Sequence, residues 1–338
     1  MKQSYYLKYA FGIAVIAAIA MSGERALTQS SDPNSAPNAY RLDEGWAAKL
    51  PEGRKFGQVI ALEPDRDGKS VWVFDRCGGT SCSQSTAAPI MKFDASGNLV
   101  ASIGAGMFNF PHGLTIDPDG SVWVSDATGR NGKGNVVVKL GPDGKVLMTL
   151  GKAGMAGDEP GYLDRPTGAA IAANGDIFVS DGHGGQSNDR IVKYAKDGKF
   201  IKAWGKRGKA QGEFDTLHGI VLDAAGRVYV ADRGNSRVQV FDADGKFIAE
   251  WKQFGRPSGL AIDKAGIIYV ADNQSNEKTN PGFKQGIRTG TVSDGKLTGF
   301  IPSPSEQIGA PEGVTADTQG NIYGGYTESR NVKRFVKR

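Results

Sequence analysis

The sequence predicts an all-β fold assembled from one structural unit that is repeated along the chain. Residues 113–151 contain four short runs of β-branched and apolar residues, separated by turns such as Gly-Pro-Asp-Gly (141–144). The runs alternate in polarity with a period of two, which is typical of β-strands. The unit recurs at 167–205, 218–251, 258–301 and, truncated, 312–336, and a looser copy runs from Gln58 to Gly104. Six copies of roughly this length predict a six-bladed β-propeller with four-stranded blades.

The last repeat has three of its four expected strands before the sequence ends at Arg338. The segment around Tyr40 to Leu50 is the natural donor of the missing strand, because it would pair a sheet edge that is otherwise exposed. We therefore expect residues 40–338 to form a single propeller, closed by an N-terminal strand.

The N-terminus has the features of an export signal. Lys2 and Lys8 accompany a nearly continuous apolar stretch from Tyr9 to Met21, and Ala18-Ile19-Ala20 offers a small-x-small cleavage motif. An uncleaved anchor is the alternative, but the stretch is short for a transmembrane helix. We expect a signal peptide over 1–26, cleaved near 20–26, and a flexible leader over 27–39. The mature protein would then be periplasmic or secreted, monomeric and without stable membrane insertion.

Cysteine usage and charge agree with export. The two cysteines, Cys77 and Cys82, are predicted to close a small disulfide loop in an oxidising compartment. A pair of metal ligands is the alternative, although a spacing of four residues is unusual for zinc. The formal charge of +5 becomes +3 without Lys2 and Lys8 (39 basic against 36 acidic residues), and no basic run stands out. Nucleic acid is therefore not an expected partner.

The three histidines of the chain occupy informative positions. His112 and His218 begin the first strands of two repeats, and His183 lies in a loop of the repeat between them. In five repeats, fourteen residues separate the first position from the end of the second strand. That register gives the pairs His112/Asp126, Thr167/Asp181, His218/Asp232, Ser258/Asp272 and Glu312/Tyr326.

With Gln58 in the first repeat, these first positions form a predicted ring around the propeller axis. Alternate blades contribute His112, His218 and Glu312. Two histidines and one glutamate are a ligand set that catalytic zinc uses, with one position open for substrate. Iron, manganese and copper follow zinc as candidates. The alternative is a polar, water-filled channel without metal.

An aspartate ends the second strand in five repeats: Asp75, Asp126, Asp181, Asp232 and Asp272. A carboxylate needed in nearly every blade is more consistent with bonding turn backbone than with catalysis. We therefore interpret these aspartates as structural.

The repeat resembles the NHL repeat, most specifically in Val-Ala-Asp-Arg-Gly-Asn-Ser-Arg-Val-Gln-Val-Phe (230–241). The arrangement also resembles peptidyl-α-hydroxyglycine α-amidating lyase, which would imply three ring histidines holding zinc. The Pro-His-Gly-Leu motif at His112 matches the first, and His218, followed by Val-Ala-Asp-Arg, matches the second. Glu312 in Pro-Glu-Gly-Val stands where the family has its third histidine.

The resemblance implies roles for four further positions. Arg76 and Arg233 match two family arginines, and His183 stands where the family has a catalytic tyrosine. With an ordinary pKa of about 6.5, a histidine suits a general base better than tyrosine. Gly313 replaces an acidic residue linked to calcium, which argues against calcium here.

The two arginines would lie on the same face as the metal, which favours an intervening substrate carboxylate. The alternative is that Arg76 and Arg233 are surface residues paired with Asp75 and Asp232. Together, the resemblance implies an exported metal-dependent lyase that cleaves a carbinolamide C–N bond in a carboxylate-bearing small molecule or peptide. A non-catalytic propeller that binds a protein or peptide on its loop face is the alternative function.

Overall fold

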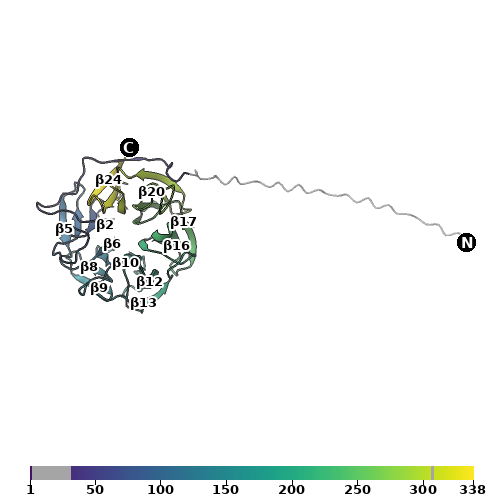
Figure 1. The fold of residues 1–338 in the computed structure, drawn as a ribbon, viewed down its shortest axis with the longest axis horizontal. Coiled ribbons are helices and arrows are strands. Elements are labelled where there is room, and N and C mark those ends of the chain that lie inside the picture. The colour runs from purple at the N-terminus through teal and green to yellow at the C-terminus, as the bar shows by residue number, and fades with distance from the viewer. Residues whose placement is uncertain (2–31, 306–307) are drawn as a thin grey trace. The chain divides into compact units, whose positions relative to one another are not determined.

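The computed structural model describes Met1, residues 32–305 and residues 308–338. Residues 2–26 of the predicted signal peptide and residues 27–31 of the predicted leader fall outside the described residues. In the described part of the chain, the strands form six four-stranded sheets arranged in a ring (Figure 1). No helix in this part has the length and apolar character needed to cross a membrane. The predicted six-bladed propeller is confirmed.

The blades follow one another along the chain. Blades one to three comprise β2 (Val59–Pro64), β3 (Val71–Asp75), β4 (Ile90–Phe93), β5 (Leu99–Ile103); β6 (Pro111–Ile116), β7 (Val122–Asp126), β8 (Val136–Leu140), β9 (Val146–Gly151); and β10 (Pro166–Ile171), β11 (Ile177–Asp181), β12 (Arg190–Tyr194), β13 (Phe200–Trp204). Blades four to six comprise β14 (Leu217–Leu222), β15 (Val228–Asp232), β16 (Arg237–Phe241), β17 (Phe247–Trp251); β18 (Leu260–Ile262), β19 (Ile267–Asp272), β20 (Gly286–Thr291), β21 (Leu297–Pro302); and β22 (Pro311–Ala316), β23 (Ile322–Tyr326), β24 (Asn331–Lys337) with β1 (Tyr40–Leu42).

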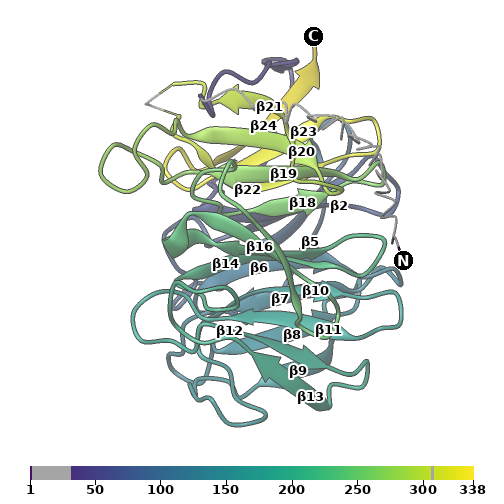
Figure 2. The same ribbon diagram turned by 90° about the vertical axis from the view of Figure 1, so that its right-hand side faces the viewer.

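Each blade is an antiparallel meander whose first strand lies nearest the axis and whose last strand lies at the rim. Figure 1 shows β2, β6 and β10 around the centre and β5, β9, β13 and β17 at the edge, and Figure 2 shows the blades from the side. In blades one to four the second strand is buried along its whole length, because neighbouring blades cover both of its faces. Apolar side chains such as Phe74, Phe108 and Val124 fill the space between blades one and two. Each sheet therefore depends on its neighbours for its core.

The ring is closed by the predicted N-terminal strand. Strand β1 pairs antiparallel with β24, in a register that sets Tyr40 opposite Lys337. An ion pair between Arg334 Nη2 and Asp43 Oδ2, 2.6 Å apart, reinforces this pairing. The closing strand covers the outer edge of β24, as expected for an edge that would otherwise be exposed.

Glycines follow the predicted ring position in five blades and allow the innermost strands to approach closely. A Cβ atom added at Gly113 would lie 2.4 Å from the carbonyl oxygen of Thr167 in the next blade. One added at Gly219 would lie 2.8 Å from the carbonyl oxygen of Ser258. The equivalent residues are Gly113, Gly168, Gly219, Gly259 and Gly313. The ring is therefore narrow enough for side chains from different blades to meet on the axis.

The repeated second-strand aspartates have the structural role that their recurrence predicts. Each accepts a hydrogen bond from a backbone N–H in the loop that leads into its own blade, for example Gly57 to Asp75 and Asn109 to Asp126. Asp232 accepts from the backbone of Asp215 at 2.8 Å and from the buried Arg237 Nε at 2.7 Å. These carboxylates fix the entry of the innermost strand, and so the position of the ring residue that it carries.

Replacing Asp232 with alanine should therefore destabilise the protein strongly. The change would remove the fully buried carboxylate that Arg237 Nε bonds, and would leave the partly exposed Glu250 as the remaining carboxylate partner of Arg237. Breaking a buried pair by removing one partner costs about 3–5 kcal/mol. Urea unfolding should show a loss of that size, whereas Asp242→Ala in an exposed turn of the same blade should cost about 0.5–1 kcal/mol. Equal losses for the two variants would contradict the structural role.

The predicted disulfide between Cys77 and Cys82 is also present. It closes the loop that follows β3, directly after Arg76, and Cys82 is buried. The disulfide therefore constrains the backbone next to one of the predicted site residues.

Candidate active site

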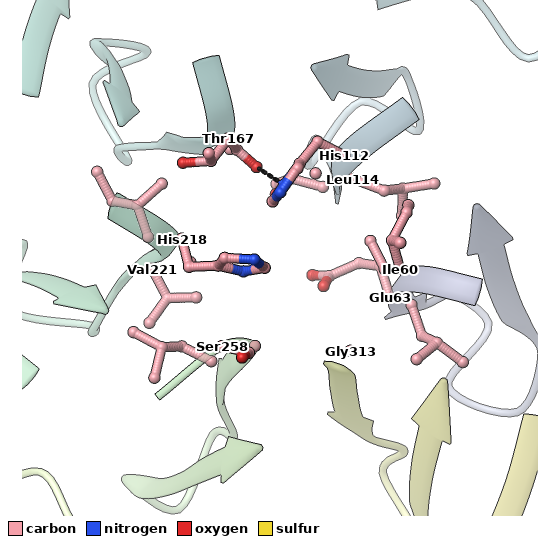
Figure 3. A pocket seen from close by; sticks show the side chains of 18 of the residues that line it. Ile60, Glu63, His112, Leu114, Thr167, His218, Val221, Ser258 and Gly313 are labelled. Atoms are coloured by element: carbon pink, nitrogen blue, oxygen red, sulfur yellow. Dashed lines mark hydrogen bonds between the residues drawn. The ribbon is translucent and has the colours of Figure 1, made fainter. Parts of the chain in front are cut away.

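The predicted ring residues lie where the register places them, at or just before the start of each innermost strand. His112, Thr167, His218 and Glu312 are the second residues of their strands, and Gln58 and Ser258 come shortly before theirs. His112, Thr167, His218 and Ser258 line a cavity of about 60 Å³ on the propeller axis. Figure 3 shows His112 and His218 directed into this cavity from blades two and four. The two predicted histidine ligands are thus brought together.

His183 joins them. Its ring centroid lies 4.7 Å from that of His112 and 5.3 Å from that of His218, and the centroids of His112 and His218 are 4.5 Å apart. One ring nitrogen from each residue lies within 4.8 Å of the others. All three histidines of the chain therefore form one cluster, contributed by blades two, three and four.

Hydrogen bonding fixes how these rings present their nitrogens. His112 Nδ1 is 3.0 Å from the carbonyl oxygen of Thr167, which can only accept, so Nδ1 carries the proton. The Nε2 atoms of His112 and His218 are buried and have no hydrogen-bond partner in the described part of the chain. A buried polar atom without a partner costs free energy, and a metal ion is one group that would satisfy it. The donor set therefore fits the predicted metal.

Burial and nearby positive charge keep the rings neutral. Burial is the main cause that lowers the pKa of His112 and His218 well below the usual value, and Arg233 and Arg76 add to it. Burial, followed by Arg233, Arg76 and Arg165, lowers the pKa of His183 to about 3. Neutral imidazole is the form that binds a metal and also the form that accepts a proton.

Glu312 approaches the cluster from blade six. Its Oε1 lies 3.4 Å from His218 Nε2, and its Oε2 accepts a hydrogen bond from Asn273 Nδ2 at 3.2 Å. Ser258 donates to the amide oxygen of Asn273 at 2.7 Å and so orients the amide group toward the carboxylate. The structure thus brings Glu312 to His218, and blade five positions the carboxylate.

Arg76 and Arg233 are buried residues and not surface residues. Each is only 6% exposed. The guanidinium of Arg76 lies over the ring of Phe110 and donates to Gln58 Oε1 at 2.6 Å, and Arg233 Nη2 is 3.4 Å from His183 Nε2. Burial lowers the pKa of Arg76, and it lowers the pKa of Arg233 to about 10, while the carboxylate of Glu312 opposes both changes.

The alternative pairing of these arginines with the preceding aspartates is not found. Asp75 has Arg54 as its ion-pair partner, and Asp232 has Arg237. Among the described residues, no carboxylate oxygen lies within 4.0 Å of the guanidinium of Arg76 or Arg233. Two buried guanidinium groups without a carboxylate partner have the chemistry that an anion would require.

Two further arginines border the cluster and were not identified from the sequence. Arg165 donates to the carbonyl oxygen of Gly184 at 3.1 Å, beside His183. Arg256 lies near Arg233, lowers its pKa, and has a buried Nε without a partner in the described chain. Both precede a proline and then a ring residue, in Arg165-Pro166-Thr167 and Arg256-Pro257-Ser258. That repeated Arg-Pro spacing is the signal that identifies them.

The loop after β11 brings His183 to the axis. Gly182 has a φ of 148° and lies so close to Asp189 that an added Cβ would be 2.4 Å from its backbone nitrogen. Asn188 Nδ2 donates to Asp181 Oδ2 at 2.8 Å, which holds the far end of the loop. The loop therefore turns inward immediately after the strand and directs His183 toward the ring.

Comparisons with known proteins agree with this architecture. The NHL repeat model matches residues 108–132 and 214–241. The chain is 30% identical over 313 residues to peptidyl-glycine alpha-amidating monooxygenase A of Xenopus laevis, covering 83% of this chain and 32% of that protein. It is 33% identical over 240 residues to peptidyl-alpha-hydroxyglycine alpha-amidating lyase 1 of Drosophila melanogaster, and this match covers 60% of this chain and 40% of that protein. It is also 32% identical over 212 residues to NHL repeat-containing protein 3 of Homo sapiens, and this match covers 60% of this chain and 56% of that protein.

The chain spans about a third of the length of the two Xenopus laevis proteins that it matches. Similar solved structures include a gluconolactonase from Xanthomonas campestris, with 15% identity, a TM-score of 0.57 and coverage of 88% of this chain and 99% of that chain. A streptogramin B lyase is similar with 14% identity, a TM-score of 0.55 and coverage of 88% and 98%. At these identities the likeness concerns the fold alone.

Proposed function

We propose that this NHL-repeat β-propeller is an exported, metal-dependent carbon–nitrogen lyase that acts on a carbinolamide bearing a carboxylate. One observation carries the proposal: neutral histidines converge on the axis next to buried arginines that lack a carboxylate partner. The first group suits a metal, and the second suits an anionic substrate. Similarity to a named α-hydroxyglycine amidating lyase supports the same reaction class.

His112 and His218 would hold the metal, because their unpaired Nε2 atoms share the axial cavity. Nitrogen ligands in a small buried site favour zinc among the common divalent ions. When bound, a zinc ion would act as a Lewis acid that lowers the pKa of a substrate hydroxyl. The carbonyl of Thr167 fixes the tautomer of His112 and so keeps Nε2 available.

Arg76 and Arg233 would bind the substrate carboxylate. They project from the ends of the second strands of blades one and four, where their residues follow Asp75 and Asp232. Gln58 and Phe110 hold the Arg76 guanidinium in place, which reduces the entropy lost when it binds an anion. The carboxylate would then orient the carbinol carbon toward the histidine cluster.

The reaction needs one proton acceptor and no oxidant. The hydroxyl proton leaves, its O–H electron pair forms the C=O bond of glyoxylate, and the C–N bond breaks. The leaving nitrogen gains a proton, so an amide and glyoxylate are the products. His183 and Glu312 are candidates at the cluster for accepting the hydroxyl proton.

The direct test is to incubate the zinc-loaded protein with an N-acyl-α-hydroxyglycine and to measure glyoxylate and amide. We expect the two products in equal amounts. Lewis-acid stabilisation contributes several kcal/mol, so a chelator should slow release by more than about 100-fold. A protein with its metal site fully loaded that gives no turnover above the uncatalysed rate would exclude this lyase function.

A second candidate is a non-catalytic propeller that binds a protein or peptide on its loop face, and similarity to NHL repeat-containing protein 3, whose name states no enzymatic activity, is compatible with it. The loops at 126–135, 181–190 and 272–287 would supply that face. This function predicts that a His112→Ala/His218→Ala double variant keeps its partner affinity, whereas the lyase function predicts that the variant is inactive.

A further inference from the structure

We infer that His183 is the third histidine ligand of the metal site, and that Glu312 serves as the proton acceptor beside it. The inference reverses the roles that the sequence predicts for these two residues. The ligand assignment rests on geometry. The role of Glu312 rests in addition on the proposed lyase function.

The spacing of the three imidazoles supports a shared ion. One nitrogen from each of His112, His183 and His218 lies within 4.8 Å of the other two. Nitrogen ligands about 2.1 Å from a tetrahedral zinc ion are about 3.4 Å apart. Small side-chain rotations that move each nitrogen by about 1 Å or less would therefore bring the three nitrogens to one ion.

Glu312 is placed differently. Its Oε1 reaches His218, but the carboxylate is not part of the set in which every donor lies within 4.8 Å of every other. Its second oxygen is engaged by Asn273, whose orientation is fixed by Ser258. A carboxylate held at the side of the cluster by an amide is arranged to face a substrate atom next to the metal.

The loop that carries His183 is built to hold a ligand still. Arg165 donates to the carbonyl oxygen of Gly184 at 3.1 Å and lies 3.4 Å from that of His183. An added Cβ at Gly185 would be 2.8 Å from Arg165 Nη1, so the glycine permits this close packing. Loop residues that position a metal ligand need this kind of support from their surroundings.

A three-histidine site of this kind takes its ligands from blades two, three and four. The opposite side of the cavity mouth then belongs to blades five, six and one, which carry Arg256, Glu312 and Arg76. A substrate carboxylate held by Arg76 of blade one and by Arg233, which lies beside His183, would set the carbinol hydroxyl between the metal and Glu312. The ligand set thus leaves the side of blades five, six and one for the substrate.

Metal binding without substrate tests the ligand assignment independently of any activity. The metal-free full-length protein and its His183→Ala and Glu312→Gln variants are titrated with Zn²⁺ against a chromophoric chelator. We expect His183→Ala to weaken zinc affinity by more than about 100-fold, since changes around a ligand alone cost about 10–100-fold. Glu312→Gln should keep zinc affinity within about tenfold of the wild type.

Spectroscopy of the Co²⁺-loaded proteins counts the imidazole ligands. X-ray absorption should show three imidazoles in the wild type and in Glu312→Gln, and two in His183→Ala. Added imidazole should restore the visible Co²⁺ spectrum of His183→Ala, which shows that the variant is folded and lacks one ligand. Gln186→Ala, an exposed change in the same loop, is the matched control and should behave as the wild type.

The opposite pattern would overturn the inference. In that pattern, His183→Ala keeps its zinc affinity, the wild type and His183→Ala both show two imidazole ligands, and Glu312→Gln loses its zinc. Absence of turnover by the zinc-loaded wild type would refute the lyase function and leave the ligand assignment standing. Where turnover is present, Glu312→Gln should lose it while remaining fully metal-loaded. Full turnover in that variant would exclude Glu312 as the proton acceptor.

Discussion

Replacing His112 and His218 together with alanine should reduce bound zinc from one ion per chain to background and abolish glyoxylate release. Both side chains are buried on the axis, and each directs an unpaired Nε2 into the same cavity. One remaining histidine does not form a closed zinc site, because catalytic zinc uses three protein ligands. Elemental analysis of the purified protein and the glyoxylate assay measure the two effects.

Thr167→Val is the matched control, because Thr167 occupies the same ring and contacts His112 through its backbone carbonyl oxygen. Its side chain bonds to Ser180 and not to the histidines. This variant should keep its zinc and most of its activity. A double histidine variant that retains stoichiometric zinc would show that the metal binds elsewhere, and the proposed site would be wrong.

Replacing Arg76 or Arg233 with glutamine should lower kcat/KM for a carboxylate substrate by about 10–150-fold for each arginine. Hydrogen bonds to a charged group are worth about 1.5–3 kcal/mol, and each 1.4 kcal/mol is a factor of ten. The effect should be specific for the anion. With an analogue whose carboxylate is converted to a carboxamide, the same substitutions should lower kcat/KM far less.

Arg130→Gln is the control for these variants, because Arg130 is exposed in a loop of blade two. It should leave both substrates unaffected. The ratio of kcat/KM for the carboxylate over the carboxamide is the decisive quantity. If that ratio stays at the wild-type value in both Arg76→Gln and Arg233→Gln, the arginines do not recognise the carboxylate.

The repeat allowed the fold and much of the site to be predicted. Alternating polarity and a constant spacing of fourteen residues place His112 and His218 on the innermost strands, and the structure confirms those positions. The register is predictable because successive side chains of a strand point to opposite faces. Burial of the apolar side chains then fixes which residues face which side. The closing strand followed from the same logic, since a missing fourth strand leaves an edge that must be paired.

The position of His183 could not be predicted in the same way. A loop has no period, and the path of 182–189 depends on the close approach of Gly182 to Asp189 and on the contacts of Arg165. Those contacts join residues that no repeat spacing relates. The arginines at 165 and 256 were missed for a related reason. Their Arg-Pro pattern is visible in the sequence, but whether their side chains reach the cluster depends on the paths of the surrounding loops.

Ring closure gives the site a thermodynamic connection to the outer edge of the molecule. A substrate held by Arg76 of blade one and Glu312 of blade six spans the joint that β1 and β24 keep closed. Any ligand that binds the closed ring alone stabilises it, by about 2.7 kcal/mol at one hundred times its dissociation constant. Occupancy of the axial cavity would therefore slow amide hydrogen exchange in β1 and β24, and a weakened closing pair would lower substrate affinity without altering any residue of the cavity.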